Sequence, residues 1–232
     1  TFLPKVGIAG GVGSANTSEG SESAGIGYVY GSYNLFNGFK DVYKSDISED
    51  ELNKIAARLA YSKLGFSTHK CTSLHGVAAP ASIMSKLLPM ISREMDEWRI
   101  ANPTHENGDV TKIVGPCMVH KAKTASDIQE GAAKVGATVY RKGGRVSGND
   151  YADHAEVIAP IIISGAKPGM TVNVDWDGRG MKVVDLMTTE FFMPILVASE
   201  MPSIDEFLKF CLVTNPHDLA VSVWSRSDKN LS

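Results

Sequence analysis

The sequence has few cysteines, and they are widely separated. Only three occur among its 232 residues, Cys71, Cys117 and Cys211, and no Cys-x-x-Cys pair is present. An odd, sparse set argues against a disulfide-stapled fold and predicts a reducing, intracellular compartment, without distinguishing the cytoplasm from an organelle lumen. The six histidines include no pair at ligand spacing on an expected helix, so we expect no metal site.

A strong excess of either charge and a long hydrophobic run are also missing. The formal net charge is −3 and the pI is near 6.1, which gives no electrostatic reason to expect nucleic-acid binding. No apolar stretch approaches the roughly 18 residues of a membrane-spanning helix. No charged-then-apolar leader follows Thr1. We therefore expect neither membrane insertion nor a signal peptide.

What is present is the composition of an ordinary globular protein. Hydrophobic residues make up 43% of the chain, which is enough for a buried core. A length of 232 residues suits one α/β domain or two small ones. We interpret residues 1–232 as a single domain with a polar loop at about residues 14–23, which is rich in Ser, Gly and Glu.

The clearest helix signal lies between residues 48 and 65. Ser48 and Glu51 have the spacing of a capping box, in which each residue satisfies a backbone N–H of the other. Apolar residues then recur at helical spacing over 52–64, and Gly65 is a plausible end.

Three further helices are expected. One should run over 81–98, where Pro89 should bend or divide it. Capping patterns predict another over 126–135 and a last one over about 204–213.

Short apolar runs between the helices predict strands. These are Val6–Ala9, Ile26–Tyr30, Leu74–Ala79, Thr138–Tyr140, Ile158–Ser164, Val183–Met187, Ile195–Ala198 and Leu219–Trp224. The stretch from Gly31 to Ser45 is ambiguous. Strands that alternate with helices predict a three-layer α/β fold, with a mainly parallel sheet covered by helices on both faces.

Three motifs follow one another near the end of the sequence. The first is Glu190-Phe191-Phe192-Met193-Pro194 before an apolar strand, the second is an acidic helix start at 203–207, and the third is a turn and strand over 215–225. In this order they resemble the catalytic domain of the aldehyde dehydrogenase superfamily. Upstream, Cys71 in His69-Lys70-Cys71-Thr72-Ser73, Gly115-Pro116 and Gly143-Gly144 extend the resemblance over about Val6 to Ser227.

The resemblance implies roles for three residues. Cys71 aligns with the family nucleophile, whose thiolate forms a thiohemiacetal with an aldehyde and then, after hydride transfer, a thioester. Glu190 matches the residue that holds the nicotinamide-side ribose, and Phe192 matches its aromatic neighbour. As part of a complete enzyme, such a chain would use NAD or NADP.

The sequence also departs from the family pattern. The family's general base is the Glu of a Glu-Leu-Gly-Gly motif, and the best counterpart here is Ile8-Ala9-Gly10-Gly11. Isoleucine at position 8 has no group that accepts a proton or activates water. Met193 stands where the family has Gly. The family's dinucleotide-binding domain and its last segment have no counterpart among these residues, so we expect no cofactor for this chain alone.

Several residues have a plainer interpretation beside the functional one. Cys71 is either a nucleophile, which His69 would polarise, or a buried thiol, and Glu190 is either a ribose ligand or a surface carboxylate. The Gly-rich loop at 10–13 is either a phosphate loop or a simple polar loop. The segment 175–178 is either a calcium loop or a hairpin turn.

Two functions from different classes follow. The first is a degenerate aldehyde-dehydrogenase-like domain without dehydrogenase activity on its own, which acts as a binding or structural subunit through a protein partner or as a homo-oligomer. The alternative is a fragment of a complete NAD(P)-dependent aldehyde or semialdehyde dehydrogenase with Cys71 as nucleophile. A weaker third possibility is a cofactor-free thiol esterase that uses Cys71.

Overall fold

The computed structural model describes residues 5–8, 32–36, 47–70, 72–101, 112–147, 155–202, 204–210 and 220–224. The helices in these ranges are α1 (Glu49–Leu64), α2 (Ala81–Asp96), α3 (Lys121–Lys134) and α4 (Ile204–Lys209), and a short 3₁₀ turn, η2 (Gly65–Thr68), follows α1. The strands are β1 (Lys5–Ile8), β2 (Ser32–Phe36), β3 (Leu74–Ala79), β4 (Arg99–Ile100), β5 (Ile113–Val114), β6 (Thr138–Arg141), β7 (Arg145–Val146), β8 (Val157–Ile158), β9 (Ile161–Ser164), β10 (Thr171–Asp175), β11 (Met181–Asp185), β12 (Ile195–Glu200) and β13 (Ala220–Trp224).

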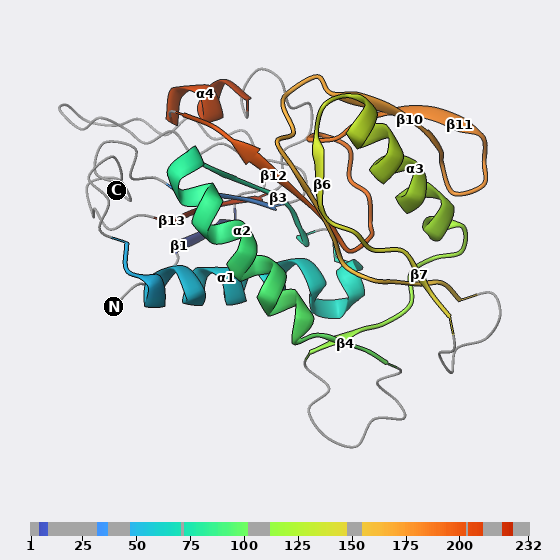
Figure 1. Cartoon of the computed structure of the whole chain (residues 1–232), viewed down its shortest axis with the longest axis horizontal. Helices are drawn as coiled ribbons and strands as arrows, with labels where there is room; N and C mark the ends of the chain where they lie inside the picture. Colours follow the sequence, from blue (N-terminus) through green and yellow to red (C-terminus); the bar gives the residue numbers. More distant parts are fainter. Residues whose placement is uncertain are drawn as a thin grey trace.

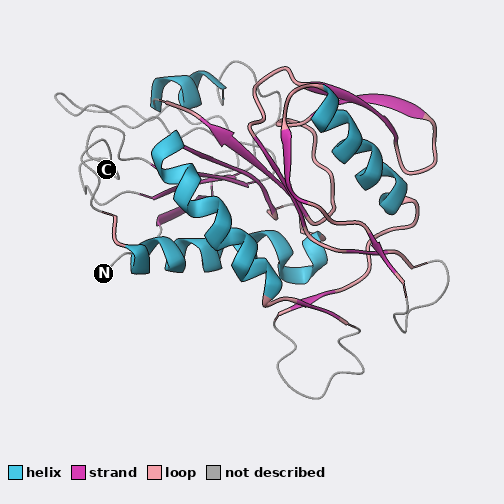
Figure 2. Ribbon diagram, in the orientation of Figure 1, coloured by secondary structure: helices cyan, strands magenta, loops and turns pink. Residues whose placement is uncertain are grey.

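Seven of these strands form the central sheet, in the order β1-β13-β2-β3-β12-β9-β6. The five inner strands are parallel to one another, whereas β1 and β6 pair antiparallel at the two edges. Figures 1 and 2 show helices packed against this sheet, together with the separate β10–β11 hairpin beside α3. The expected mainly parallel α/β fold is confirmed.

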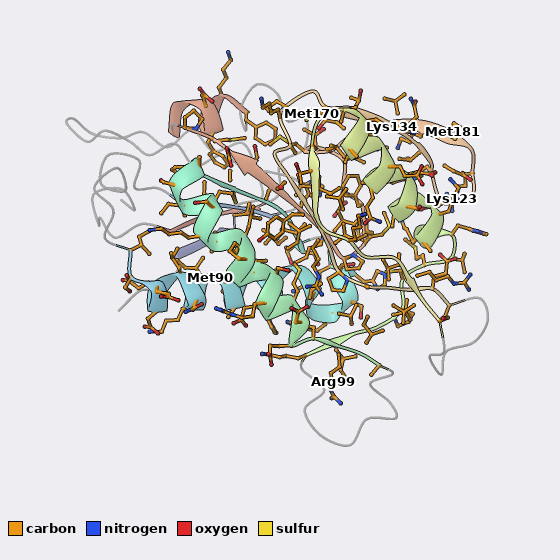
Figure 3. All side chains as sticks on the ribbon, in the orientation of Figure 1. Met90, Arg99, Lys123, Lys134, Met170 and Met181 are labelled. Carbon is orange, nitrogen blue, oxygen red and sulfur yellow. The ribbon has the colours of Figure 1, made fainter. Side chains whose placement is uncertain are left out.

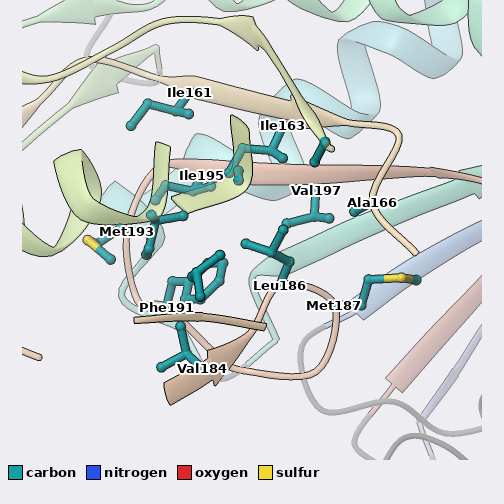
Figure 4. Close-up of a cluster of buried hydrophobic side chains, with 14 of the residues drawn as sticks. Ile161, Ile163, Ala166, Val184, Leu186, Met187, Phe191, Met193, Ile195 and Val197 are labelled. Atoms are coloured by element: carbon teal, nitrogen blue, oxygen red, sulfur yellow. The ribbon is translucent and has the colours of Figure 1, made fainter. Parts of the chain in front are cut away.

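Alternate residues of the central strands point into two hydrophobic cores, one on each face. Leu196 and Ile162 pack with α1 and α2. Their neighbours in sequence, such as Ile195 and Ile163, pack with α3 and the β10–β11 hairpin on the opposite face, where Phe191 and Met193 also lie (Figure 4). Because side chains alternate along a strand, one buried sheet supports both layers.

Helix α1 forms as its sequence predicts. Ser48 caps it, with its side chain accepting from the Glu51 N–H while the Glu51 carboxylate accepts from the Ser48 N–H at 2.9 Å. The helix ends at Gly65. Helix α2 is continuous, so Pro89 does not divide it. Pro89 lies on the exposed side of the helix.

Other expectations need correction. Helix α3 begins at Lys121, not at 126, because His120 adopts the left-handed conformation (φ 67°) and turns the chain into the helix without a side-chain cap. The expected strand 158–164 is two strands, β8 and β9, on either side of Ala159-Pro160. Strand β2 lies in the stretch that was ambiguous. The expected strand 26–30 lies outside the described residues. None of the described helices has both the length and the apolar character needed to cross a membrane.

Candidate functional site

The starts of strands β3 and β12 lie side by side and define the candidate site. The pairing of Val197 with Gly76 places Ile195 level with Leu74. Cys71 lies outside the described residues, but its neighbours on both sides, Lys70 and Thr72, are described and lead directly into β3. The segment 188–194, which contains Glu190 and Phe192, leads into β12. The sheet therefore brings two of the sequence-predicted segments together.

The position expected for the general base lies farther away. Ile8 is the last residue of β1 and pairs with Ala220 at the start of β13. Through the register of β13 and β2, it is at the same level as the start of β3, but three strands across the sheet. At about 4.8 Å between strands, the lateral separation is about 14 Å. Ile8 therefore lies at the end of the sheet where β3 begins, but it is three strands away from β3.

Glu190 is partly buried, and Phe192 has a strained backbone. Burial raises the pKa of Glu190, and the nearby Lys63 lowers it in part. Phe192 has φ 51°, in the left-handed region that non-glycine residues rarely adopt. Between them, the Phe191 ring packs 5.1 Å from the His75 ring on β3. The Glu190–Phe192 segment is therefore packed against the first residues of β3.

A cluster of buried ionisable residues surrounds these strand starts, and the sequence analysis missed it. Lys63 is 3% exposed, His75 2% and Lys121 2%, and Cys117 is buried beside them. Lys63 lies four residues after Leu59 and seven after Ala56, on the inner face of α1. This helical spacing from buried apolar residues could have predicted that Lys63 faces the core.

Burial dominates the protonation of this cluster. It lowers the pKa of Lys63 from 10.5 to about 7, against the opposing influence of Cys117 and Glu190. It lowers the pKa of His75 to about 3, so this imidazole is neutral and its Nε2 lies 3.1 Å from the Leu186 carbonyl oxygen. It raises the pKa of the Cys117 thiol to about 11, although Lys121 and Lys63 lower it.

Lys121 has a structural role that its contacts define. Its Nζ donates to the Phe191 carbonyl at 3.1 Å, lies 3.0 Å from the Asp177 carboxylate and sits 5.0 Å from the centre of the Trp176 ring. It thereby ties the turn of the β10–β11 hairpin to the segment that enters β12.

The segment 175–178 is a hairpin turn held by α3. The Asp177 carboxylate pairs with Lys121, and one carboxylate oxygen of Asp175 accepts from Gly180 N–H at 3.2 Å. Thr124 Oγ1 donates to the Asp175 carbonyl at 2.7 Å. No group of three or more His, Cys, Asp or Glu among the described residues is arranged to hold a metal ion.

The connection from α1 to β3 is strained and contains unpaired polar groups. Phe66, Ser67 and Thr68 all have positive φ, which costs about 1–2 kcal/mol per residue. Gly115 N–H donates to Ser67 Oγ at 2.8 Å and helps to hold this turn. The hydroxyl oxygens of Thr68 and Ser73 are buried and have no hydrogen-bond partner. Buried polar atoms of this kind point to a bound polar group or water.

Two surface grooves lie away from this cluster. One, of about 370 Å³, runs between α3 and β10, where Lys123, Lys134 and Met181 are labelled in Figure 3. The other lies between α1 and α2 beside Met90. Neither is lined by the residues of the strand starts.

The described chain has the fold of the aldehyde dehydrogenase catalytic domain. It is similar to methylmalonate-semialdehyde dehydrogenase from Oceanimonas doudoroffii, with a TM-score of 0.64 and 15% identity over 89% of this chain and 36% of that one. It is also similar to the aldehyde dehydrogenase KauB from Pseudomonas aeruginosa and to an indole-3-acetaldehyde dehydrogenase in complex with NAD+, each with a TM-score of 0.63 and 17% identity over 88% of this chain.

The chain spans about a third of the length of these structures, 35% in the last two cases. No protein-family model matches the sequence, and no curated protein matches it at a significant level. The likeness therefore establishes the fold and leaves the activity to be argued from the residues.

Proposed function

We propose that this chain is a divergent aldehyde-dehydrogenase-like domain that does not oxidise aldehydes on its own and acts as a binding or structural subunit. The observation that carries the proposal is Ile8 at the position of the general base. In the family mechanism, water must be activated to release the acyl group from the cysteine, and a hydrocarbon side chain accepts no proton. The register of β1 adds that position 8 lies about 14 Å across the sheet from the start of β3.

The exposed face of the β10–β11 hairpin supports a binding role. Met181 and Val183 on β11 are 70% and 61% exposed, and among the described residues β11 pairs only with β10. An open strand edge with apolar side chains favours association with another chain. A protein partner or a second copy of the chain fits this surface.

The alternative is a complete NAD(P)-dependent aldehyde or semialdehyde dehydrogenase of which this chain is a part. The adjacent starts of β3 and β12 favour it, because they bring the Cys71 region beside Glu190 and Phe192. Glu190 would accept hydrogen bonds from the ribose, Phe192 would flank the nicotinamide, and Cys71 would be the nucleophile. The cofactor would supply the hydride acceptor.

Aldehyde-dependent reduction of NAD and NADP, with propanal as the probe, separates the two functions when it is measured on the protein purified in the form in which its source makes it. The proposal expects no rate above that of the Cys71→Ala variant, together with a molar mass in light scattering above that of one chain. Turnover that disappears in Cys71→Ala would overturn it and establish the alternative. A strictly monomeric chain that binds no partner would refute the subunit role.

A further inference from the structure

The C-terminal end of α1 carries exposed aromatic rings next to cationic side chains. Tyr61, in the last turn of the helix, is 40% exposed, and Phe66, in η2, is 71% exposed. Phe66 is the most exposed large hydrophobic side chain among the described residues. Neighbouring apolar rings that are open to water are characteristic of an interaction surface.

Two cationic side chains lie over these rings. Lys70 Nζ is 4.8 Å from the centre of the Phe66 ring and 6.0 Å from the centre of the Tyr61 ring, so one ammonium group joins the two rings. The Arg58 guanidinium carbon is 5.7 Å from the centre of the Tyr61 ring. These separations are within the range of cation–π contacts. Arg58, Tyr61, Phe66 and Lys70 therefore form one surface, which we call the cation–aromatic patch.

The positive charge of the cation–aromatic patch is not neutralised within the described part of the chain. Neither Arg58 nor Lys70 forms an ion pair with a carboxylate of the described residues, whereas Lys54, one turn before Arg58 on α1, pairs with Asp50. Burial lowers the pKa of Lys70, and the charge of Arg58 lowers it further, so the two cations repel one another. A carboxylate bound between them would relieve this repulsion.

The fold holds the two rings in place. The Tyr61 ring packs 6.0 Å from the ring of the buried Trp98. Phe66 has a left-handed backbone, with φ 57°, and its carbonyl accepts from the His69 N–H at 3.0 Å, which closes the turn. A ring that is already fixed loses little conformational entropy when a partner packs on it, so this surface is preorganised for binding.

We propose that the cation–aromatic patch is a docking site for an acidic segment of a partner protein that carries an aromatic side chain. The carboxylates of the segment pair with Arg58 and Lys70, and its ring packs on Phe66. A protein segment fits better than a nucleic acid, because the net charge of −3 gives the chain no long-range attraction for phosphates. Helix α1 and the β10–β11 hairpin lie on opposite faces of the sheet (Figure 1), so this site is distinct from the surface discussed under the proposed function.

Fluorescence anisotropy with a labelled peptide tests this assignment. The probe is fluorescein-Gly-Glu-Glu-Trp-Glu-Glu, and the matched peptides replace Trp with Ala or each Glu with Gln. The protein, purified in the form in which its source makes it, should bind the probe with a dissociation constant below about 1 mM. Either peptide replacement should weaken binding by about threefold or more. High salt should also weaken it, because salt screens the charge pairs.

Variants of the patch and matched controls locate the binding site. Arg58→Gln, Lys70→Gln and Phe66→Asn should each weaken binding of the probe by about threefold or more. Asparagine tolerates the left-handed backbone at position 66, so this variant should keep its fold. Lys54→Gln removes a cation that is already paired, and Tyr140→Ser removes a 42% exposed ring on β6. Neither control should change binding of the probe.

Three kinds of result would overturn the proposal. The first is no saturable binding of the probe, and the second is unchanged binding in all three patch variants when their urea midpoints match that of the wild type. The third is a different occupant: tighter binding of single-stranded oligothymidylate or of phosphatidylserine vesicles than of the probe, or self-association that Phe66→Asn abolishes. Peptide binding is measured separately from NAD reduction and from association through the β10–β11 hairpin, so failure of this proposal is distinguishable from failure of the proposed function.

Discussion

Replacing Lys63 with methionine should stabilise the protein at neutral pH. Methionine keeps the length of the side chain and removes the charge. A pKa lowered from 10.5 to about 7 corresponds to about 5 kcal/mol of destabilisation when the lysine is fully protonated, at about 1.4 kcal/mol per pKa unit. At pH 7, where the folded lysine is half protonated, about 4 kcal/mol of this remains. With a urea m-value of about 3 kcal/mol per M, the midpoint of unfolding should rise by about 1 M.

The sign of the pH dependence provides the sharper test. Between about pH 7 and 10.5 the unfolded chain holds more protons on Lys63 than the folded chain, so the free energy of unfolding of the wild type rises with pH. The advantage of Lys63→Met should therefore fall by about 2–3 kcal/mol between pH 7 and 9. Above pH 9, Cys117 lowers the free energy of unfolding as the pH rises, because burial raises the pKa of its thiol to about 11. The measurement therefore stops at pH 9.

Urea unfolding of the wild type, Lys63→Met and Lys54→Met at pH 7, 8 and 9 provides the measurement and its control. Lys54 is 70% exposed and pairs with Asp50 on the helix surface, so its replacement should leave the free energy of unfolding nearly unchanged at every pH. An advantage of Lys63→Met that is the same at pH 7 and pH 9 would refute the reasoning, as would a variant that is less stable than the wild type at pH 7.

Two further substitutions test the packing around the site. Lys121→Met should lower the free energy of unfolding by about 3 kcal/mol, because it leaves Asp177 and the Phe191 carbonyl without their partner. Lys123→Met, on the exposed side of α3, should leave the midpoint of the same urea titration nearly unchanged. Gly131→Ala should cost about 1–3 kcal/mol, since the new methyl group would lie 2.6 Å from Val172 Cβ, whereas Gly144→Ala meets no atom within 4 Å and should leave the thermal midpoint nearly unchanged. If Lys121→Met destabilised the protein no more than Lys123→Met, or Gly131→Ala no more than Gly144→Ala, the described packing would be wrong.

The sequence predicts the parts of the fold whose signals are local. Helix α1 has its capping box and β3 its continuous apolar run, and both form where expected. The start of α3 has no such signal, because His120 enters the helix through a left-handed conformation. Asp127, which lies inside α3 and not at a helix start, accepts from the Asp175 N–H on β10 at 2.9 Å. The role of this carboxylate is therefore set by its tertiary contact with β10, which the local sequence does not reveal.

The candidate site was only partly predictable, because some of its residues are marked by local motifs and others only by their burial in the fold. A resemblance of motifs suggests Glu190 and Phe192 as candidate cofactor-binding residues, because a motif preserves spacing along the chain. It does not identify Lys63 or Lys121, whose importance depends on burial. Lysine on a helix usually marks its solvent face, and only the spacing of Lys63 from Leu59 and Ala56 places it on the inner face.

Cys117 indicates what a cysteine at this edge of the sheet needs in order to become a nucleophile. Two lysines, Lys121 and Lys63, lower the pKa of its thiol, and the pKa is still raised to about 11 because burial outweighs them. Nearby positive charge is therefore insufficient for a thiolate in this cluster. Cys71 would need greater exposure to water, or a dedicated base, to react at neutral pH. If Ile8 holds the position of the general base, as we propose, exposure is the remaining route. We therefore expect a free thiolate only if Cys71 is open to solvent, and in that case iodoacetamide should alkylate it at neutral pH well before Cys117.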